Sequence, residues 1–266
     1  MLIDTHCHLT FDDLAPQADA VLSRAAAAGV SRVITVATDV ADTRAAVRLM
    51  RDHPNVDLSA GIHPHEAAKA TETDLAALAD LHRGRWGDEV EMRRVVAVGE
   101  IGLDFHYDFA TPEQQERLLR AQLEIARETR RPVVIHARRA ETNVCDVLDD
   151  YPELAGRAVF HCFSGDETVA RRILDAGNLL SFTGVVTFKN ADEMRRVARM
   201  APADRILVET DAPFLTPEPI RKIRPCEPAH VVHTARFLAD LRHESLDRFA
   251  EATTQNAERF FGLPGA

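Results

Sequence analysis

The sequence alternates short apolar runs with longer segments of helical periodicity, and this alternation constrains the fold more than any other feature. Most of the runs lack the alternating polar positions of a half-exposed strand, which is typical of parallel strands covered on both faces. Runs of this kind predict eight strands. The expected strands are residues 1–7, 32–37, 56–62, 94–101, 132–137, 157–162, 178–183 and 205–210.

Helical segments separate the expected strands. One begins after Thr111, where Pro112 takes the first helical position and Gln114 completes a capping box. Two others stop at Gly29 and Gly177, because glycine suits the left-handed position just beyond a helix. The expected helices are residues 16–28, 41–52, 72–82, 112–130, 141–150, 166–176, 191–200, 228–241 and 245–261.

These elements predict a single α/β domain over residues 1–266, a (β/α)8 TIM barrel with an extra C-terminal helix. Eight strand–helix units in about 250 residues are typical of this barrel. A doubly wound open sheet is the alternative, but no Gly-rich phosphate-binding loop follows any of the apolar runs. Residues 83–94 are polar and are expected to form a surface loop away from the catalytic face.

The cellular location is inferred from segments that the sequence lacks. The N-terminal residues carry neither the basic nor the apolar segment of a secretory signal, and no apolar run approaches the roughly 18 residues of a membrane span. The four cysteines (Cys7, Cys145, Cys162 and Cys226) include no C-x-x-C pair and fit reduced thiols. We therefore expect a cytoplasmic protein with no membrane association and no obligate protein partner.

Histidines gather where the strands are expected to end. The catalytic residues of a TIM barrel come from the C-terminal ends of several strands, so side chains at these positions converge. Seven of the 12 histidines occupy such positions, which is the pattern that a metal site requires. They are His6, His8, His63, His65, His106, His136 and His161.

The first and fourth strands supply the first candidate ligands. Since side chains alternate along a strand, His6 and His8 point together and can chelate a metal ion. Cys7 points the other way and is expected to be a small buried residue rather than a ligand. Glu100 ends the run VVAVGE, where an unpaired carboxylate would be costly. A structural ion pair is the alternative, but we favour a carboxylate that bridges two metal ions.

His136, His161 and Asp211 end the runs VVIH, AVFH and ILVETD. Either histidine alone fits a hydrogen-bonded core residue equally well. Their positions on successive strands, with Glu100 on the strand before, favour metal ligation for both.

Two further acids stand two residues before candidate ligands. Asp4 precedes His6 and Glu209 precedes Asp211, so each acid shares a strand face with the ligand that follows it. Metal-bound histidines usually donate their second ring N–H to such a group, and we expect Asp4 and Glu209 to accept it. Structural pairing deeper in the barrel is the alternative for both.

Taken together, these residues resemble the TatD family of metal-dependent nucleases, which belongs to the amidohydrolase-like barrels. The resemblance extends from residue 3 to residue 263, and the order of the motifs is more specific than any one of them. One departure is Cys226-Glu227-Pro228, where the family commonly has Asn-Glu-Pro, so the role of that Asn is in doubt here. The matching motifs are IDTHCHL, GIHPHEA, VGEIGLDFHYD, PVVIHAR, HCFSG, SFTGVVTFKNA, LVETDAPFLTP and QNAERFFGL.

The resemblance implies a hydrolase with two divalent metal ions that cleaves the phosphodiester bonds of nucleic acid, such as an exonuclease on single-stranded DNA. It implies that Asp211 is also the general base, and that His63, His65 and His106 can donate hydrogen bonds to phosphate. The histidine-rich donor set suits Zn²⁺, whereas enzymes of the family are often assayed with Mg²⁺ or Mn²⁺. One ion would be held by His6, His8, Glu100 and Asp211, and the other by Glu100, His136 and His161.

The net charge of −10 argues against a protein that coats DNA with a basic face. A phosphate can still meet positive charge where metal ions supply it. Five basic residues on the expected barrel-top loops are candidates for guiding the nucleic-acid backbone, although a solvated surface explains them equally well. They are Arg138, Arg139, Arg221, Lys222 and Arg224.

Two other classes of function remain open. A metal-dependent acyl or amide hydrolase of the same barrel superfamily, such as a D-aminoacyl-tRNA deacylase, could use the same ligands. Many relatives bridge their metals with a carboxylated lysine, but the three lysines (Lys69, Lys189 and Lys222) lie outside strands four and five, which leaves the bridge to Glu100. A non-enzymatic protein on a decayed barrel is disfavoured because all six expected ligands are present.

Overall fold

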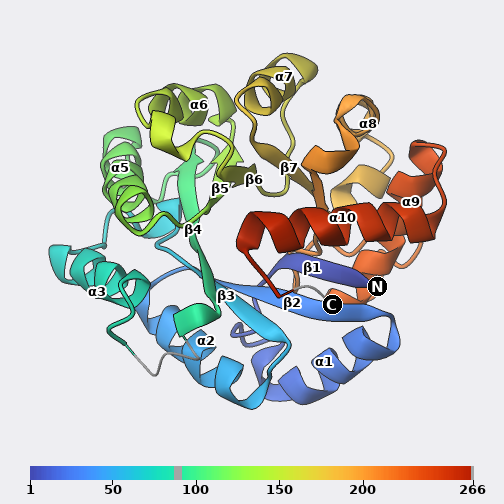
Figure 1. Cartoon of the computed structure of the whole chain (residues 1–266), viewed down its shortest axis with the longest axis horizontal. Coiled ribbons are helices and arrows are strands. Elements are labelled where there is room, and N and C mark those ends of the chain that lie inside the picture. Colours follow the sequence, from blue (N-terminus) through green and yellow to red (C-terminus); the bar gives the residue numbers. More distant parts are fainter. Residues whose placement is uncertain (87–91, 265–266) are drawn as a thin grey trace.

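The computed structural model describes residues 1–86 and 92–264 and confirms the predicted TIM barrel. Eight parallel strands pair in the order of the sequence, and the helices surround them (Figure 1). The expected loop over residues 83–94 lies partly outside the described residues. The strands are β1 (Leu2–Cys7), β2 (Val30–Ala37), β3 (Val56–Ala60), β4 (Val95–Asp104), β5 (Val133–Arg138), β6 (Ala158–Phe160), β7 (Leu179–Phe182) and β8 (Ile206–Val208).

All nine expected helices are present. The segments 16–28 and 228–241 each begin with a short 3₁₀ turn before the α-helix. The capping box of Thr111 and Gln114 forms as predicted and opens the longest helix. The helices are α1 (Ala18–Ala27), α2 (Val40–Asp52), α3 (Glu72–His82), α5 (Pro112–Thr129), α6 (Glu141–Asp149), α7 (Glu167–Asp175), α8 (Asp192–Met200), α9 (Val231–Leu241) and α10 (Leu246–Phe261).

Several strands end at other residues than expected, and backbone pairing explains why. β4 continues to Asp104 because its ladder with β5 runs on to the pair Asp104–Arg138. β6 and β8 stop earlier than expected. Beyond them, the N–H of Cys162 donates to the Glu209 carboxylate, and a side chain of β1 likewise accepts the N–H of Thr210.

The barrel is nearly closed by contacts between its first and last strands. The N–H of His8 donates to the carbonyl of Ala212 at 2.7 Å, and the N–H of Asp211 donates to the carbonyl of His6 at 2.9 Å. A parallel bridge joins Cys7 to Ala212 between them. This seam brings the residues that follow β8 next to the histidine pair of β1.

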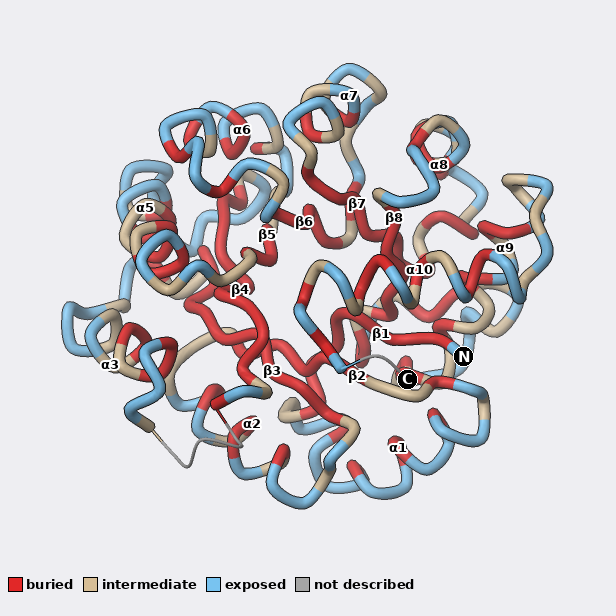
Figure 2. Tube along the Cα trace, in the orientation of Figure 1, coloured by how far each residue is buried: buried red, intermediate tan, exposed pale blue. Residues whose placement is uncertain are grey.

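Helix α10 covers the N-terminal end of the barrel (Figure 1). Phe261 and Leu263 pack against apolar residues inside the barrel, such as Ile34 of β2. Asn256 donates to the carbonyl of Ile206 at 2.9 Å, which fixes the helix to the start of β8. The strands are mostly buried, and the helices expose mainly their outer faces (Figure 2). The C-terminal strand ends are therefore left to form the functional site.

Within the described part of the chain, no helix combines the length and the apolar character needed to cross a membrane.

His82, at the end of α3, should make the stability of the fold depend on pH. Its buried Nε2 donates to the carbonyl of Ala60 at 2.9 Å, and burial lowers its pKa from 6.5 to about 4. Between these values the unfolded chain binds a proton that the folded chain does not, so stability is lost as the pH falls. The loss at pH 5 from this group should be about 2 kcal/mol.

The test compares the urea unfolding midpoints of the wild type and of His82→Gln at pH 7 and pH 5. Glutamine can still donate to Ala60 but does not titrate, so the variant should lose less stability between the two pH values. Equal losses in both proteins would show that His82 does not carry this pH dependence.

Candidate metal centre

Glu100 lies at the centre of a cluster of imidazoles at the C-terminal mouth of the barrel. Its Oε1 lies 2.7 Å from Nδ1 of His136 and 2.7 Å from Nε2 of His161. The same oxygen is 3.5 Å from Nε2 of His63, and Oε2 is 3.4 Å from Nε2 of His6. One buried carboxylate thus connects histidines from four different parts of the chain.

Two glycines allow Glu100 to reach this position. Gly99 and Gly102 both have a positive φ, and a Cβ on Gly102 would collide with the backbone carbonyl of His136. A Cβ on Gly99 would lie 2.6 Å from the Cβ of Val134. β4 can therefore approach β5 closely only with glycine on both sides of Glu100.

Asp211 reaches the cluster from the segment after β8. Its Oδ1 lies 3.4 Å from Nε2 of His8 and 3.7 Å from Nε2 of His6. The structure therefore brings together all six residues that the sequence analysis named as ligands. Ligand atoms within 4.8 Å of one another form the sets His6–His8–Glu100, His6–His161–Asp211 and Glu100–His136–His161.

The hydrogen bonds of the histidines favour metal ligation. Nδ1 of His8 lies 3.0 Å from the carbonyl of Val36 and must donate to it, which leaves the lone pair of Nε2 facing the cluster. Nε2 of His136 lies 3.0 Å from Oδ2 of Asp104, so its Nδ1 faces Glu100. Both ring nitrogens of His6 are buried and have no hydrogen-bond partner within the described residues. Such a buried group is costly unless a bound cation takes up its lone pair.

The charges of the cluster also fit bound cations. Burial alone would raise the pKa of Glu100, but the charge of His161 and the hydrogen bonds from His136 and His161 outweigh it and hold the pKa well below its ordinary value. The pKa of Asp211 is likewise lowered, mainly by the hydrogen bond with His8, against the opposing effect of burial. Within residues 1–86 and 92–264, neither acid forms an ion pair with lysine or arginine.

Asp104 is a site residue that the sequence analysis did not single out. It is fully buried, and its Oδ2 lies 2.8 Å from Nε2 of His65 and 3.0 Å from Nε2 of His136. Its Oδ1 accepts the backbone N–H groups of His106 and Tyr107 at 2.8 Å and 3.2 Å. One carboxylate thus fixes the ring of a candidate ligand and the start of the loop after β4.

A signal for Asp104 exists in the sequence. Asp104 follows Glu100 by four positions on one strand, so the two acids lie on the same face. Because the sequence analysis ended this strand at residue 101, it placed Asp104 in a loop, where a shared strand face with Glu100 is not expected.

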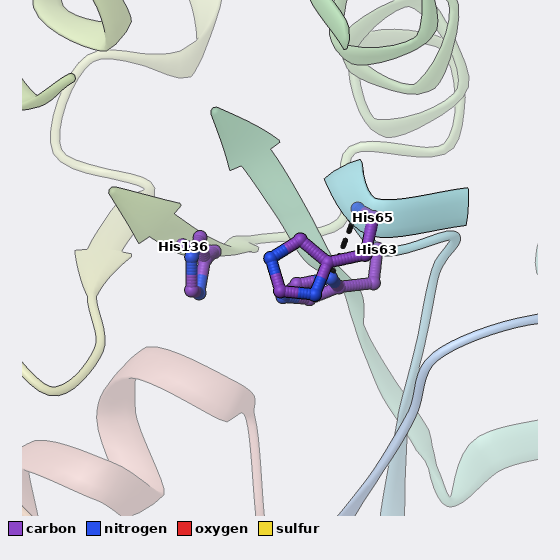
Figure 3. A group of neighbouring side chains, drawn as sticks. All are labelled: His63, His65 and His136. Carbon is purple, nitrogen blue, oxygen red and sulfur yellow. Dashed lines mark hydrogen bonds between the residues drawn. The ribbon is translucent and has the colours of Figure 1, made fainter. Parts of the chain in front are cut away.

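His63 is held as a hydrogen-bond donor. The N–H of His65 donates to Nδ1 of His63 at 3.1 Å, so the proton of the neutral ring lies on Nε2, which points to Glu100. Figure 3 shows the rings of His63 and His65, from the segment after β3, facing His136 at the end of β5. Their ring centroids lie 4.5 Å and 6.0 Å from that of His136.

The other expected substrate contacts differ in their placement. His65 lies at the rim and is partly exposed, with its ring nitrogen on Asp104. His106 is exposed, and within the described residues its ring contacts Tyr107 rather than the candidate ligands. The five expected backbone-guiding residues are all exposed, one at the end of β5 and the others in the segments that follow β5 and β8: Arg138, Arg139, Arg221, Lys222 and Arg224.

Of the two acids expected to support ligands, Glu209 lies beside the ring of a candidate ligand, although that ring does not form a hydrogen bond with it. Its Oε1 lies 3.4 Å from Nδ1 of His161 and accepts the N–H of Cys162 at 2.6 Å. Its Oε2 accepts the hydroxyl of Ser181 at 2.6 Å.

Asp4 makes a different contact from the expected one. It accepts the N–H and the hydroxyl of Thr210 at 2.8 Å and 2.6 Å, and it does not bond to either ring nitrogen of His6. The reason is geometric, because the Asp4 side chain lies one layer deeper and points across the seam to β8. Asp4 therefore positions the segment before Asp211. This is the structural pairing deeper in the barrel that the sequence analysis gave as the alternative to a hydrogen bond with His6.

Two cysteines are placed away from the candidate ligand atoms. Cys7 is fully buried with its Sγ 3.7 Å from the carbonyl of Ile34, on the opposite side of β1 from the histidine pair, as expected. Cys226, the departure from the family motif, is also fully buried, and its N–H donates to the carbonyl of Pro213. Its side chain is thus part of the packing beneath the loop after β8.

Comparisons with known proteins agree with this geometry. The family model described as TatD related DNase matches residues 3–262. The uncharacterized metal-dependent hydrolase YabD of Bacillus subtilis (strain 168) is 36% identical over 263 residues, which cover 99% of this chain and 100% of that protein. The 3'-5' ssDNA/RNA exonuclease TatD of Citrobacter rodentium (strain ICC168) is 34% identical, with 98% of each chain covered.

The crystal structure of YJJV, a TatD homologue from Escherichia coli K12, is similar throughout. It superposes with a TM-score of 0.92 at 32% sequence identity, and the match covers 99% of this chain and 98% of that one.

Replacing Asp104 should weaken metal binding at His136. In Asp104→Asn the amide can donate to Nε2 of His136, which moves the ring proton to the nitrogen that faces Glu100. We expect the affinity for one ion to fall roughly 10–100-fold, as measured by calorimetric titration of the metal-free protein.

Asp108→Asn is the matched control, because Asp108 is an exposed acid in the segment that follows β4 and the change in charge is identical. Its metal affinity should equal that of the wild type. Equal affinities in Asp104→Asn and the control would contradict the positioning role of Asp104.

Proposed function

Because the chain belongs to the TatD-related DNase family of metal-dependent hydrolases, we propose that it hydrolyses phosphodiester bonds of nucleic acid. Single-stranded DNA is the expected substrate, and exonucleolytic cleavage is the expected mode. The observation that carries this proposal is the cluster around Glu100, which gathers six metal-ligating side chains at the barrel mouth. The similarity to the 3'-5' ssDNA/RNA exonuclease TatD of Citrobacter rodentium supports the substrate class.

Two divalent ions are part of the proposal. Glu100 offers both oxygens to separate groups of histidines, so it can be shared between two ions. β4 and β5 contain no lysine, so a carboxylated lysine cannot replace it. The imidazole-rich donor set favours Zn²⁺, with Mg²⁺ and Mn²⁺ as the other candidates. The proposed sets are His6, His8, Glu100 and Asp211 for one ion, and Glu100, His136 and His161 for the other.

The side chains of the chain itself can perform the proton and binding steps. When bound, the ions supply Lewis-acid stabilisation of phosphoryl oxygens and lower the pKa of water. The Asp211 carboxylate, ionised and 15% exposed at the mouth, can accept the proton of the attacking water. The water oxygen bonds to phosphorus as the bond to the leaving oxygen breaks, and Nε2–H of His63 can donate to a phosphoryl oxygen.

The direct test is digestion of end-labelled single-stranded DNA and RNA with Zn²⁺, Mg²⁺ or Mn²⁺. We expect cleavage of DNA with at least one of these ions and complete loss after treatment with a chelator. A D-aminoacyl-tRNA assayed in parallel examines the acyl-hydrolase alternative. Release of the amino acid without cleavage of any strand would reject the nuclease proposal in favour of that alternative.

Metal content tests the sharing of Glu100. Glu100→Ala should lower the occupancy of both sites, because it removes a ligand from each, whereas His8→Ala should empty mainly one. Metal analysis of both purified variants and the wild type gives the ratio per chain. Wild-type metal content in Glu100→Ala would rule out a bridging carboxylate.

The role of Asp211 as base is tested by Asp211→Asn, which keeps a ligating oxygen but removes the negative charge. At saturating metal we expect kcat on single-stranded DNA to fall about 10²–10⁴-fold, the usual contribution of general base catalysis. Glu209→Gln changes a residue that lies behind His161 and outside the six candidate ligands, so this variant should lose only roughly 10–100-fold. A metal-saturated Asp211→Asn variant with wild-type kcat, measured where chemistry limits the rate, would mean that another group accepts the proton.

A further inference from the structure

The exposed large apolar side chains gather at the mouth of the barrel. Five such residues occur in the described part of the chain, and four of them follow β4 or β8. Scattered exposed apolar residues are common and need no explanation. The grouping of exposed apolar side chains beside the cluster of candidate ligands does need an explanation. The four are Tyr107 (42% exposed), Phe109 (59%), Phe214 (49%) and Ile223 (50%).

One group of rings lies on the β4 side, and we call Tyr107 and Phe109 the Tyr107 platform. Their centroids are 5.5 Å apart, and those of Phe109 and Tyr107 lie 4.6 Å and 5.4 Å from the ring of His65. His65 in turn bonds to Asp104, so the platform adjoins the candidate centre. The guanidinium of Arg138 lies 5.0 Å from the centroid of Tyr107.

A second group lies on the other side, and we call Phe11 and Phe214 the Phe214 platform. The ring of Phe11 stacks on His8 with a centroid distance of 4.5 Å and an interplanar angle of 16°. Phe214 meets Phe11 edge-on at 6.2 Å. A hollow adjoins Phe214 and is bordered by Arg224.

The two platforms flank the cluster. The Phe214 platform belongs to the seam between β8 and β1, and the Tyr107 platform belongs to β4 and its neighbour β5. In the ring of eight strands these two places lie opposite each other. Each platform contacts a histidine of the mouth, so a chain that crosses the mouth with a phosphate at Glu100 passes over both.

We propose that the Tyr107 and Phe214 platforms bind, by stacking, the bases of the nucleotides on the two sides of the scissile phosphate. The proposal rests on the proposed function and adds the groups that select an unpaired strand. Every base offers a π face to an aromatic ring, so such binding depends little on sequence or on the sugar. In a duplex the bases stack on one another and their faces are covered.

The cations near the rings are consistent with this occupant. Arg138 and Arg139 have no carboxylate at ion-pair distance among the described residues, and both are exposed beside the Tyr107 platform. Arg224 is exposed and borders the hollow beside Phe214. Positive side chains interleaved with aromatic rings are typical of proteins that bind single-stranded nucleic acid.

The first measurement is the fluorescence of a single-stranded phosphorothioate oligonucleotide with one 2-aminopurine, which is quenched when the base stacks. We expect quenching with the wild type in metal-containing buffer. Tyr107→Ala and Phe214→Ala should each weaken binding roughly 5- to 150-fold. Tyr107→Phe and Phe214→Tyr keep the ring and should retain most of the affinity. The backbone N–H of Tyr107, which bonds to Asp104, is kept in all of these variants.

The matched control is Phe260→Ala, which removes a partly buried ring from α10 at the opposite end of the barrel and should leave binding unchanged. The second measurement repeats binding and cleavage with a strand that carries abasic residues on both sides of the cleaved bond. The alanine variants and the wild type should bind and cleave this strand equally well.

Equal affinity of the alanine variants and the wild type for the base-bearing strand would overturn the stacking proposal. So would an equal loss of affinity for the abasic strand, because the rings would then contact the backbone. If the wild type cleaves no strand under any metal, the hydrolytic proposal fails and the quenching result decides the stacking proposal by itself.

Discussion

The arrangement of the candidate metal centre depends on the buried carboxylate of Glu100. No arginine or lysine pairs with it among the described residues, and four imidazole nitrogens approach within 3.5 Å. A charge removed from water must be compensated, and here the compensation comes from neutral or protonated rings and, when bound, from cations. The outer hydrogen bonds of His8 to the carbonyl of Val36 and of His136 to Asp104 then determine which nitrogen of each ring faces the cluster.

The barrel concentrates these polar groups at one end because the other end is filled. α10 closes the N-terminal end with Phe261 and Leu263, which complete an apolar interior. The mouth is therefore the place where buried polar side chains meet solvent and where a substrate can enter. The extra helix contributes none of the six candidate ligands, but it packs against the end of the barrel opposite the cluster.

Much of this arrangement could be predicted from the sequence, for a physical reason. Alternating apolar runs specify strands and helices locally, and the order of eight units leaves few topologies. Parallel strands align their C-terminal ends, so residues such as His136 and His161 had to converge once the barrel was assumed. Contacts that depend on backbone details were less accessible. Asp4 bonds to Thr210, which lies across the seam between β1 and β8. Asp104 takes its role because β4 pairs with β5 for three residues beyond the expected end of the strand.

The seam between the first and last strands has a consequence for biosynthesis. The ribosome makes His6 and His8 long before Asp211, and the hydrogen bonds that join these two segments exist only when both are present. A nascent chain that ends before β8 carries five of the six candidate ligands on an open sheet with unpaired edges. The candidate centre can be completed only after the residues that follow β8 have been synthesised.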